Sequence, residues 1–285
     1  MDFANKAELM KIAQMVAEIV PNCCGVTLGG SRAHDLQDAQ SDVEMYFYST
    51  DSIPALADID ACLLELGAEH KRWPEFLWNE YPWGPHSFFL LDGLYFEIGY
   101  RIIGEIDEKI QAYLAGNVAP QKDCHDLGMG YVYSGLAASV CAEKILLARD
   151  NDIKELKIRS AVFPETLHRA LEQEYMATAK NLLDGKLASA ALREDIFFYE
   201  VLASRIIRSL MIMAFSISEV HFPGDKWNEA LLLRTDWVGR TEFLSLLKKH
   251  WCINSTEPGA LRKKRDILLL AYDLVEAGLH EAKAD

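Results

Sequence analysis

Two carboxylates lie two residues apart at the start of a short apolar segment, where Asp42 and Glu44 alternate with Val43 and Met45. Alternate residues of a β-strand point to the same face, so Asp42 and Glu44 share one face of the predicted strand. Two acidic side chains this close repel each other unless they are solvated or paired. A divalent cation between them removes the conflict, and the pair therefore indicates a metal site.

A glycine turn precedes this segment. Gly29-Gly30-Ser31 follows the apolar residues up to Leu28 and offers backbone N–H groups to a phosphate. Most such tripeptides are ordinary turns, and the tripeptide alone is a weak signal. A phosphate site beside a metal site is typical of nucleotide chemistry.

A third carboxylate, Glu97, belongs to the second of two predicted strands, 87–91 and 94–101. Asp92-Gly93 between them favours a β-hairpin, because both residues tolerate positive φ. Alternation sets Glu97 on the opposite face from its apolar neighbours. Asp92 is the alternative third carboxylate, but in the predicted turn it should point to solvent.

In this order, Leu28-Gly29-Gly30-Ser31, then Asp42-Val43-Glu44, then Glu97, the chain resembles the nucleotidyltransferase superfamily. Among its members it is most similar to the antibiotic nucleotidyltransferases of the lincosamide and aminoglycoside type. The resemblance covers residues 28–97, and beyond them it rests on architecture alone. Glu44 stands where many relatives have Asp, which the superfamily pattern permits.

The resemblance implies a Mg²⁺-dependent enzyme that transfers a nucleoside monophosphate, AMP from ATP, to a hydroxyl of a small molecule such as an antibiotic. Asp42, Glu44 and Glu97 would be the metal ligands and catalytic residues, and the family favours Glu97 as the base. Gly30 and Ser31 would hold the β- and γ-phosphates. Two alternatives remain: a protein acceptor, as in toxin–antitoxin pairs, and a catalytically silent nucleotide-binding module.

Basic residues for the triphosphate are harder to identify. Lys226 follows a predicted helix break and is our candidate, with solvated surface charge as the alternative. Arg205 and Arg208 share one helix face, where ion pairing is the alternative. His34 is the histidine nearest the motif, and 262–265 is interpreted as a solvated basic helix face rather than a nucleic-acid patch.

An aromatic segment could form the wall of an acceptor or base pocket, because aromatic faces suit sugars and nucleobases. The alternative is that its rings pack on the sheet. Its members are Trp73, Trp78, Tyr81 and Trp83.

These residues need a scaffold of the α/β plus α class: an N-terminal nucleotidyltransferase-type mixed sheet with flanking helices over 1–158, and a C-terminal helical bundle over 159–285. In the first part the patterns predict helices over 4–20, 54–66 and 104–115, and strands over 24–28, 42–48, 87–91, 94–101 and 144–148. In the second they predict a helix from Pro164 to Gly185, then helices over 190–218, 226–233, 240–249 and 258–280.

Composition limits the partners. The 285 residues include 43 acidic and 29 basic side chains, for a net charge of −14, which disfavours nucleic acids and anionic membranes. Six cysteines without a CxxC pair fit a reducing cytoplasm. We expect no signal peptide and no membrane span, and a monomer or homodimer that binds a nucleoside triphosphate and a small-molecule acceptor.

Overall fold

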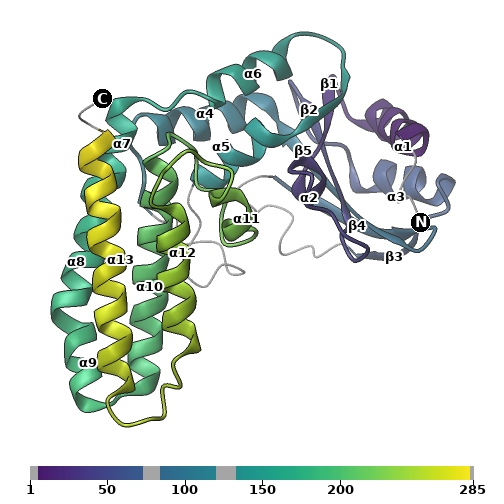
Figure 1. Ribbon diagram of the computed structural model, residues 1–285. Helices are drawn as coiled ribbons and strands as arrows, with labels where there is room; N and C mark the ends of the chain where they lie inside the picture. Colours follow the sequence, from purple (N-terminus) through teal and green to yellow (C-terminus); the bar gives the residue numbers. More distant parts are fainter. Residues whose placement is uncertain (1–5, 73–83, 120–132, 283–285) are drawn as a thin grey trace. The chain divides into compact units, whose positions relative to one another are not determined.

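The structure is a computed structural model that describes residues 6–72, 84–119 and 133–282 (Figure 1). Trp73, Trp78, Tyr81 and Trp83 lie outside the described residues, so the pocket-wall hypothesis stays a prediction. Among the described residues, no helix is both long enough and apolar enough to cross a membrane.

The described chain forms two compact units. The first, which we call the sheet unit, consists of the described parts of Met1–Ala112 and Gln121–Val162. The second, the helical unit, consists of those of Tyr113–Pro120 and Phe163–Asp285.

A mixed six-stranded sheet organises the sheet unit. Its spatial order is β3-β4-β5-β2-β1-β6, in which β2 pairs with β5 in parallel and every other neighbouring pair is antiparallel. The strands are β1 (Cys23–Leu28), β2 (Val43–Ser49), β3 (Glu69–Arg72), β4 (His86–Leu91), β5 (Leu94–Ile102) and β6 (Lys144–Ala148). The expected class, a mixed α/β sheet with flanking helices and a helical C-terminal region, is confirmed.

The β4–β5 hairpin turns at Asp92-Gly93, as the sequence predicts. Both residues have positive φ, 50° and 78°, which suits a two-residue turn between twisted strands. The turn fixes the pairing along the whole hairpin, from Leu91 opposite Leu94 to His86 opposite Gly99.

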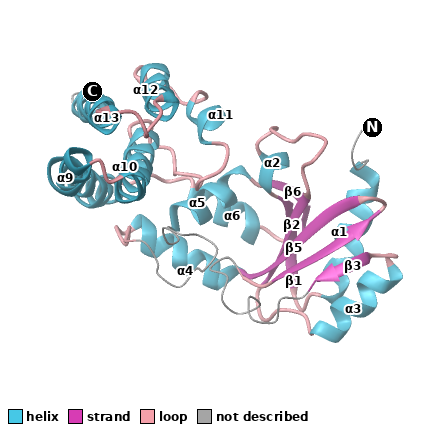
Figure 2. Ribbon diagram, turned by 90° about the horizontal axis from the view of Figure 1, so that it is seen from below, coloured by secondary structure: helices cyan, strands magenta, loops and turns pink. Residues whose placement is uncertain are grey.

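One face of the sheet carries the apolar core. Val43, Met45 and Phe47 of β2 are completely buried there, as strand alternation predicts. Helices α1 (Lys6–Ile19) and α3 (Leu56–Glu65) supply the apolar residues opposite them. Figure 2 shows both helices on the same side of the sheet.

The other face of the sheet buries an ion pair. Arg101 Nη1 of β5 lies 2.7 Å from Glu143 Oε1, and both side chains are almost fully buried. Tyr48 OH of β2 and Thr27 Oγ1 of β1 each donate a hydrogen bond of 2.7 Å to Glu143 Oε2. Burial by itself would raise the pKa of Glu143, but Arg101 and these hydrogen bonds outweigh it and hold the pKa below its ordinary value.

Glu143 directly follows a helix that the sequence analysis missed, α5 (Tyr133–Ala142), and precedes β6. Helix α6 (Asp152–Ser160) was missed as well. From α6, Lys157 Nζ donates to the carbonyl oxygens of Val140, Cys141 and Glu143, which anchors the end of α5. The two remaining helices of this part are α2 (Gly30–Ala33) and α4 (Ile103–Leu114).

The helical unit differs from its prediction in two places. The helix that begins after Pro164 does not end at Gly185, because α7 (Glu165–Leu171), α8 (Ala177–Asn181) and α9 (Leu187–Arg193) join through π-helical turns. These turns are η1 (Glu172–Met176) and η2 (Leu182–Lys186). An inserted residue in each turn keeps the helix continuous.

The predicted helix over 190–218 is also divided. Glu194 has a left-handed backbone with φ of 54°, which ends α9, and the Asp195 side chain accepts from Phe198 N to begin α10 (Ile196–Ser216). The remaining helices are α11 (Asn228–Leu232), α12 (Arg240–Cys252) and α13 (Ala260–Ala282). Helices α9, α10, α12 and α13 pack against one another (Figure 1).

His250 of α12 is fully buried in the helical unit, stacked on Tyr199 of α10 with 6.3 Å between ring centroids. Neither ring nitrogen has a hydrogen-bond partner among the described residues. Burial and the nearby Lys264 ammonium lower the pKa of His250 to about 4, so the ring is neutral at pH 7.

We expect Glu143→Gln to lower the free energy of unfolding by about 3–5 kcal/mol, because it leaves the buried Arg101 cation without its counter-charge. Asp35→Asn is the matched control, since it breaks an ion pair with Lys144 that is largely exposed and should cost about 1 kcal/mol or less. Urea unfolding curves measure both. Equal losses in the two variants would contradict a central role for the buried pair.

His250 should make stability fall in acid. Its folded pKa lies below the unfolded value of 6.5, so between pH 6.5 and about 4 the unfolded chain binds a proton that the folded chain excludes. This loss of stability grows as the pH falls and reaches at most about 3 kcal/mol. His250→Phe keeps a ring against Tyr199 but cannot titrate, so its unfolding free energy should depend less on pH. If the unfolding free energies of the wild type and His250→Phe changed with pH in the same way, His250 would not be the source of the acid sensitivity.

Candidate active site

Three carboxylates gather at one end of the parallel pair β2–β5. Asp42, Glu44 and Glu97 each place an oxygen within 4.8 Å of the other two. Glu44 and Glu97 are half-buried, and Asp42 is more exposed. The structure thus brings together the three residues that the sequence analysis singled out.

Strand geometry explains the grouping. Asp42 immediately precedes β2 and shares a face with Glu44, two residues later. Glu97 of β5 is the register partner of Glu44 across the parallel ladder. Partners in adjacent strands point to the same face, so Glu97 joins the pair without any loop to position it.

Tyr46 holds the Glu44 carboxylate from the same face of β2. Its hydroxyl donates to Glu44 Oε2 at 2.9 Å. The Arg101 guanidinium carbon lies 3.5 Å from the centroid of the Tyr46 ring, in a cation–π contact. Burial first, and then the Glu44 charge, raise the pKa of Tyr46 well above its ordinary value, so the hydroxyl remains a donor.

His86 holds Glu97, and the sequence analysis missed it. His86 Nδ1 lies 2.6 Å from Glu97 Oε1. The hairpin turn could have identified this contact: it pairs Phe88 with Glu97 and His86 with Gly99, so His86 is the diagonal neighbour of Glu97 on one face. His34, the histidine that the sequence favoured, ends α2 and is not a member of the carboxylate group.

The glycine turn lies against Glu44. Gly29 N donates to Glu44 O at 2.8 Å, and Gly30 has a left-handed φ of 56°. A Cβ atom on Gly30 would lie 2.0 Å from Glu44 Oε1, so only glycine permits this approach. Ser31 is buried beside it, and its Oγ has no hydrogen-bond partner among the described residues.

Arg32 connects the glycine turn to the backbone of Asp42. Its Nε donates to the backbone oxygen of Asp42 at 3.1 Å, and its side chain is buried. Burial lowers the pKa of Arg32, and the Asp42 charge opposes the change. The sequence analysis missed Arg32, because spacing alone does not show that an arginine bonds to backbone ten residues away.

The donor set suits a hard divalent cation. Carboxylate oxygens are the ligands that Mg²⁺ prefers, and a divalent ion would reduce the repulsion among three carboxylates that lie within 4.8 Å of one another. A soft metal would favour sulfur or imidazole.

The basic residues predicted for the triphosphate, Lys226, Arg205 and Arg208, belong to the helical unit. Lys226 is exposed, Arg205 is exposed on α10, and Arg208 Nε lies 3.2 Å from Asp225 Oδ1. The ion-pair alternative therefore holds for Arg208, whereas a phosphate contact of Lys226 stays a prediction. Asp92 is exposed in its turn, as expected.

The solvated basic face over 262–265 is wrong at two positions. Arg265 is half-buried, and its Nε donates to Leu183 O at 3.0 Å. Lys264 is buried, and its Nζ donates to Glu200 Oε1 and to Ser255 Oγ. Arg262 and Lys263 are exposed, as expected.

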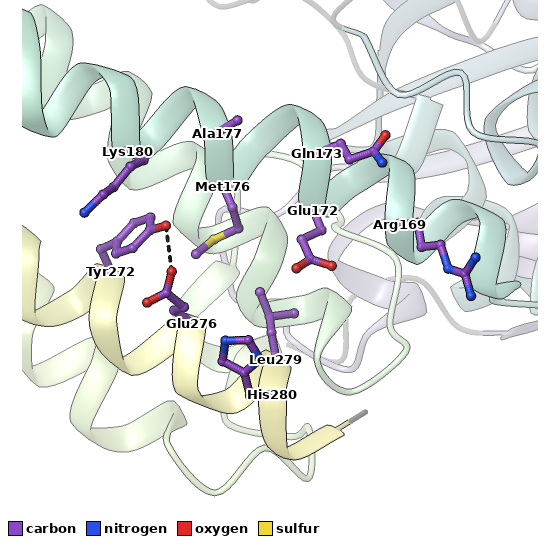
Figure 3. Close-up of a pocket in the computed structure, with 10 residues that line it drawn as sticks. All are labelled: Arg169, Glu172, Gln173, Met176, Ala177, Lys180, Tyr272, Glu276, Leu279 and His280. Atoms are coloured by element: carbon purple, nitrogen blue, oxygen red, sulfur yellow. Dashed lines mark hydrogen bonds between the residues drawn. The ribbon is translucent and has the colours of Figure 1, made fainter. Parts of the chain in front are cut away.

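A pocket of about 460 Å³ lies within the helical unit (Figure 3). Met176, Lys180 and Tyr272 line it, and Tyr272 OH donates to Glu276 Oε1 at 3.0 Å. None of the predicted site residues lines this pocket, so it is separate from the carboxylate group.

Two comparisons with known proteins give a match. Residues 134–228 match a family described as "Domain of unknown function (DUF4037)". A solved structure of a nucleotidyltransferase-like protein from Exiguobacterium sibiricum 255-15 aligns over 95% of this chain and 74% of that chain, with a TM-score of 0.46 and 12% identity. No curated protein matches the sequence.

Gly30→Ala should disturb the carboxylates as well as the fold. The added methyl group is strained by the left-handed backbone and clashes with Glu44, so the free energy of unfolding should fall by about 2–4 kcal/mol. The displaced carboxylate should also weaken Mn²⁺ binding. Gly93→Ala is the control, because Gly93 has a φ of 78° but a Cβ atom added there would meet nothing within 4 Å. It should cost about 1 kcal/mol and leave Mn²⁺ affinity unchanged. Calorimetric Mn²⁺ titration and unfolding curves test the pair, and equal Mn²⁺ affinities would contradict it.

Proposed function

We propose that the chain is a Mg²⁺-dependent nucleotidyltransferase that moves a nucleoside monophosphate, AMP from ATP, to a hydroxyl of a small molecule. The observation that supports this is the group of Asp42, Glu44 and Glu97 beside the Gly30-Ser31 turn. It combines oxygen ligands for a divalent ion with a backbone turn and a buried hydroxyl suited to phosphate.

Asp42 and Glu44 would hold the ion, with Glu97 as a third ligand or as the base. When bound, Mg²⁺ would stabilise the negative charge that develops on the phosphoryl oxygens. Residues of the chain would carry out the proton transfer and the phosphate binding. Glu97 would accept the acceptor's hydroxyl proton as that oxygen bonds to the α-phosphorus and the bond to pyrophosphate breaks. The Gly30 amide and the Ser31 hydroxyl would hold the β- and γ-phosphates.

For the acceptor, we propose a hydroxylated small molecule of the antibiotic class, related to lincosamides or aminoglycosides. The net charge of −14 favours a cationic acceptor such as an aminoglycoside. A protein acceptor and a silent nucleotide-binding module are the outcomes that the experiment below must separate from it.

We expect pyrophosphate release when the protein is incubated with ATP, Mg²⁺ and an acceptor panel. Asp42→Asn should reduce turnover to background, and Glu97→Gln should reduce it by about 10²–10⁴-fold, the usual contribution of a positioned base. Asp92→Asn is the matched control and should retain activity, because Asp92 lies exposed in the hairpin turn.

A labelled adduct on a cellular protein would instead identify a protein acceptor. Absence of pyrophosphate release with all four nucleoside triphosphates and every acceptor would contradict the proposal. Binding of ATP under these conditions would identify a silent nucleotide-binding module. Loss of activity in Asp92→Asn but not in Glu97→Gln would overturn the choice of Glu97.

A further inference from the structure

We propose that His86 is a positioning residue that fixes the Glu97 carboxylate for metal binding, an inference that rests on the proposed function. The two side chains meet at 2.6 Å between His86 Nδ1 and Glu97 Oε1. An imidazole nitrogen and a carboxylate oxygen at this distance attract each other when the nitrogen carries its proton.

His86 is well placed to hold a fixed orientation. Its side chain is 1% exposed, whereas that of Glu97 is 22% exposed, so the contact joins a buried side chain to a more exposed one. The imidazole is flanked by the rings of Tyr46 and Phe88, each with a centroid 6.1 Å away. Rings on two sides restrict rotation of the imidazole and therefore fix the direction of its N–H.

Gly99 provides the space for this ring. It lies opposite His86 in the β4–β5 ladder, and a Cβ atom there would be 2.7 Å from both His86 Nε2 and Tyr46 Cδ1. Glycine is a poor strand residue, so its presence within β5 needs a packing reason. The close approach of His86 and Tyr46 is such a reason.

Glu44 and Glu97, the two carboxylates in strands, are each contacted by one neighbouring side chain. Tyr46 OH donates to Glu44 Oε2 at 2.9 Å, and His86 Nδ1 lies 2.6 Å from Glu97 Oε1. Tyr46 and His86 are both buried, whereas Asp42 is more exposed. Partners that orient a ligand in this way typically change metal affinity or activity by about 10–100-fold when removed.

The test is calorimetric titration of the full chain with Mn²⁺, which needs no turnover. His86→Leu removes the donor and should weaken Mn²⁺ binding by about 10–100-fold. His86→Asn keeps an amide donor near the Nδ1 position and should stay close to the wild-type affinity. His86→Gln, whose amide lies one carbon farther out, should resemble His86→Leu and serves as the second loss variant if His86→Leu does not fold.

Wild-type affinity in folded His86→Leu or His86→Gln would overturn the positioning role, as would equal losses in His86→Asn and His86→Gln. A wild-type protein that binds no Mn²⁺ would overturn it too. If the Mn²⁺ pattern holds but no nucleoside triphosphate releases pyrophosphate, the positioning role stands and the proposed function fails.

Discussion

The parallel pairing of β2 with β5 is the constraint on which the site depends. It makes Glu44 and Glu97 direct register partners, although α3, β3 and β4 lie between them in the sequence. In a parallel ladder, a shift of one residue would turn one of the two carboxylates to the apolar face. Because that face is filled by the residues around Val43 and Ile98, the hydrophobic core itself holds the register that creates the site.

The face of the sheet that carries the carboxylates also holds a buried cation. Arg101 contacts the ring of Tyr46, whose hydroxyl donates to Glu44. Its own charge is balanced by Glu143. The polar network therefore links the end of α5 to the carboxylate group, and stability and site geometry share the same residues. This coupling gives a physical reason for burying an ion pair that an apolar pair could replace at lower cost.

Sequence patterns predicted local features well and long-range polar contacts poorly. Alternation in β2 and the Asp92-Gly93 turn depend on neighbouring residues, and both were predicted. The helix end at Gly185 was wrong because packing in the bundle overrides the low helix propensity of glycine. Lys264 was placed on the surface because a run of basic residues does not reveal its Glu200 partner on another helix.

By itself, the sequence determined the strand faces and the hairpin, because each follows from a period of two or a short turn. The resemblance to nucleotidyltransferases, and not the periodicity, added Glu97 to Asp42 and Glu44. Only the tertiary structure decided that strands β2 and β5 are adjacent and parallel, and that Arg101, Tyr46 and His86 support the carboxylates. Those contacts join residues far apart in the chain, and their formation depends on which strands the core selects as neighbours. His86 was determined partly by each. The Asp92-Gly93 turn sets the hairpin register that brings His86 near Glu97, but the role of His86 follows only if Glu97 belongs to the site.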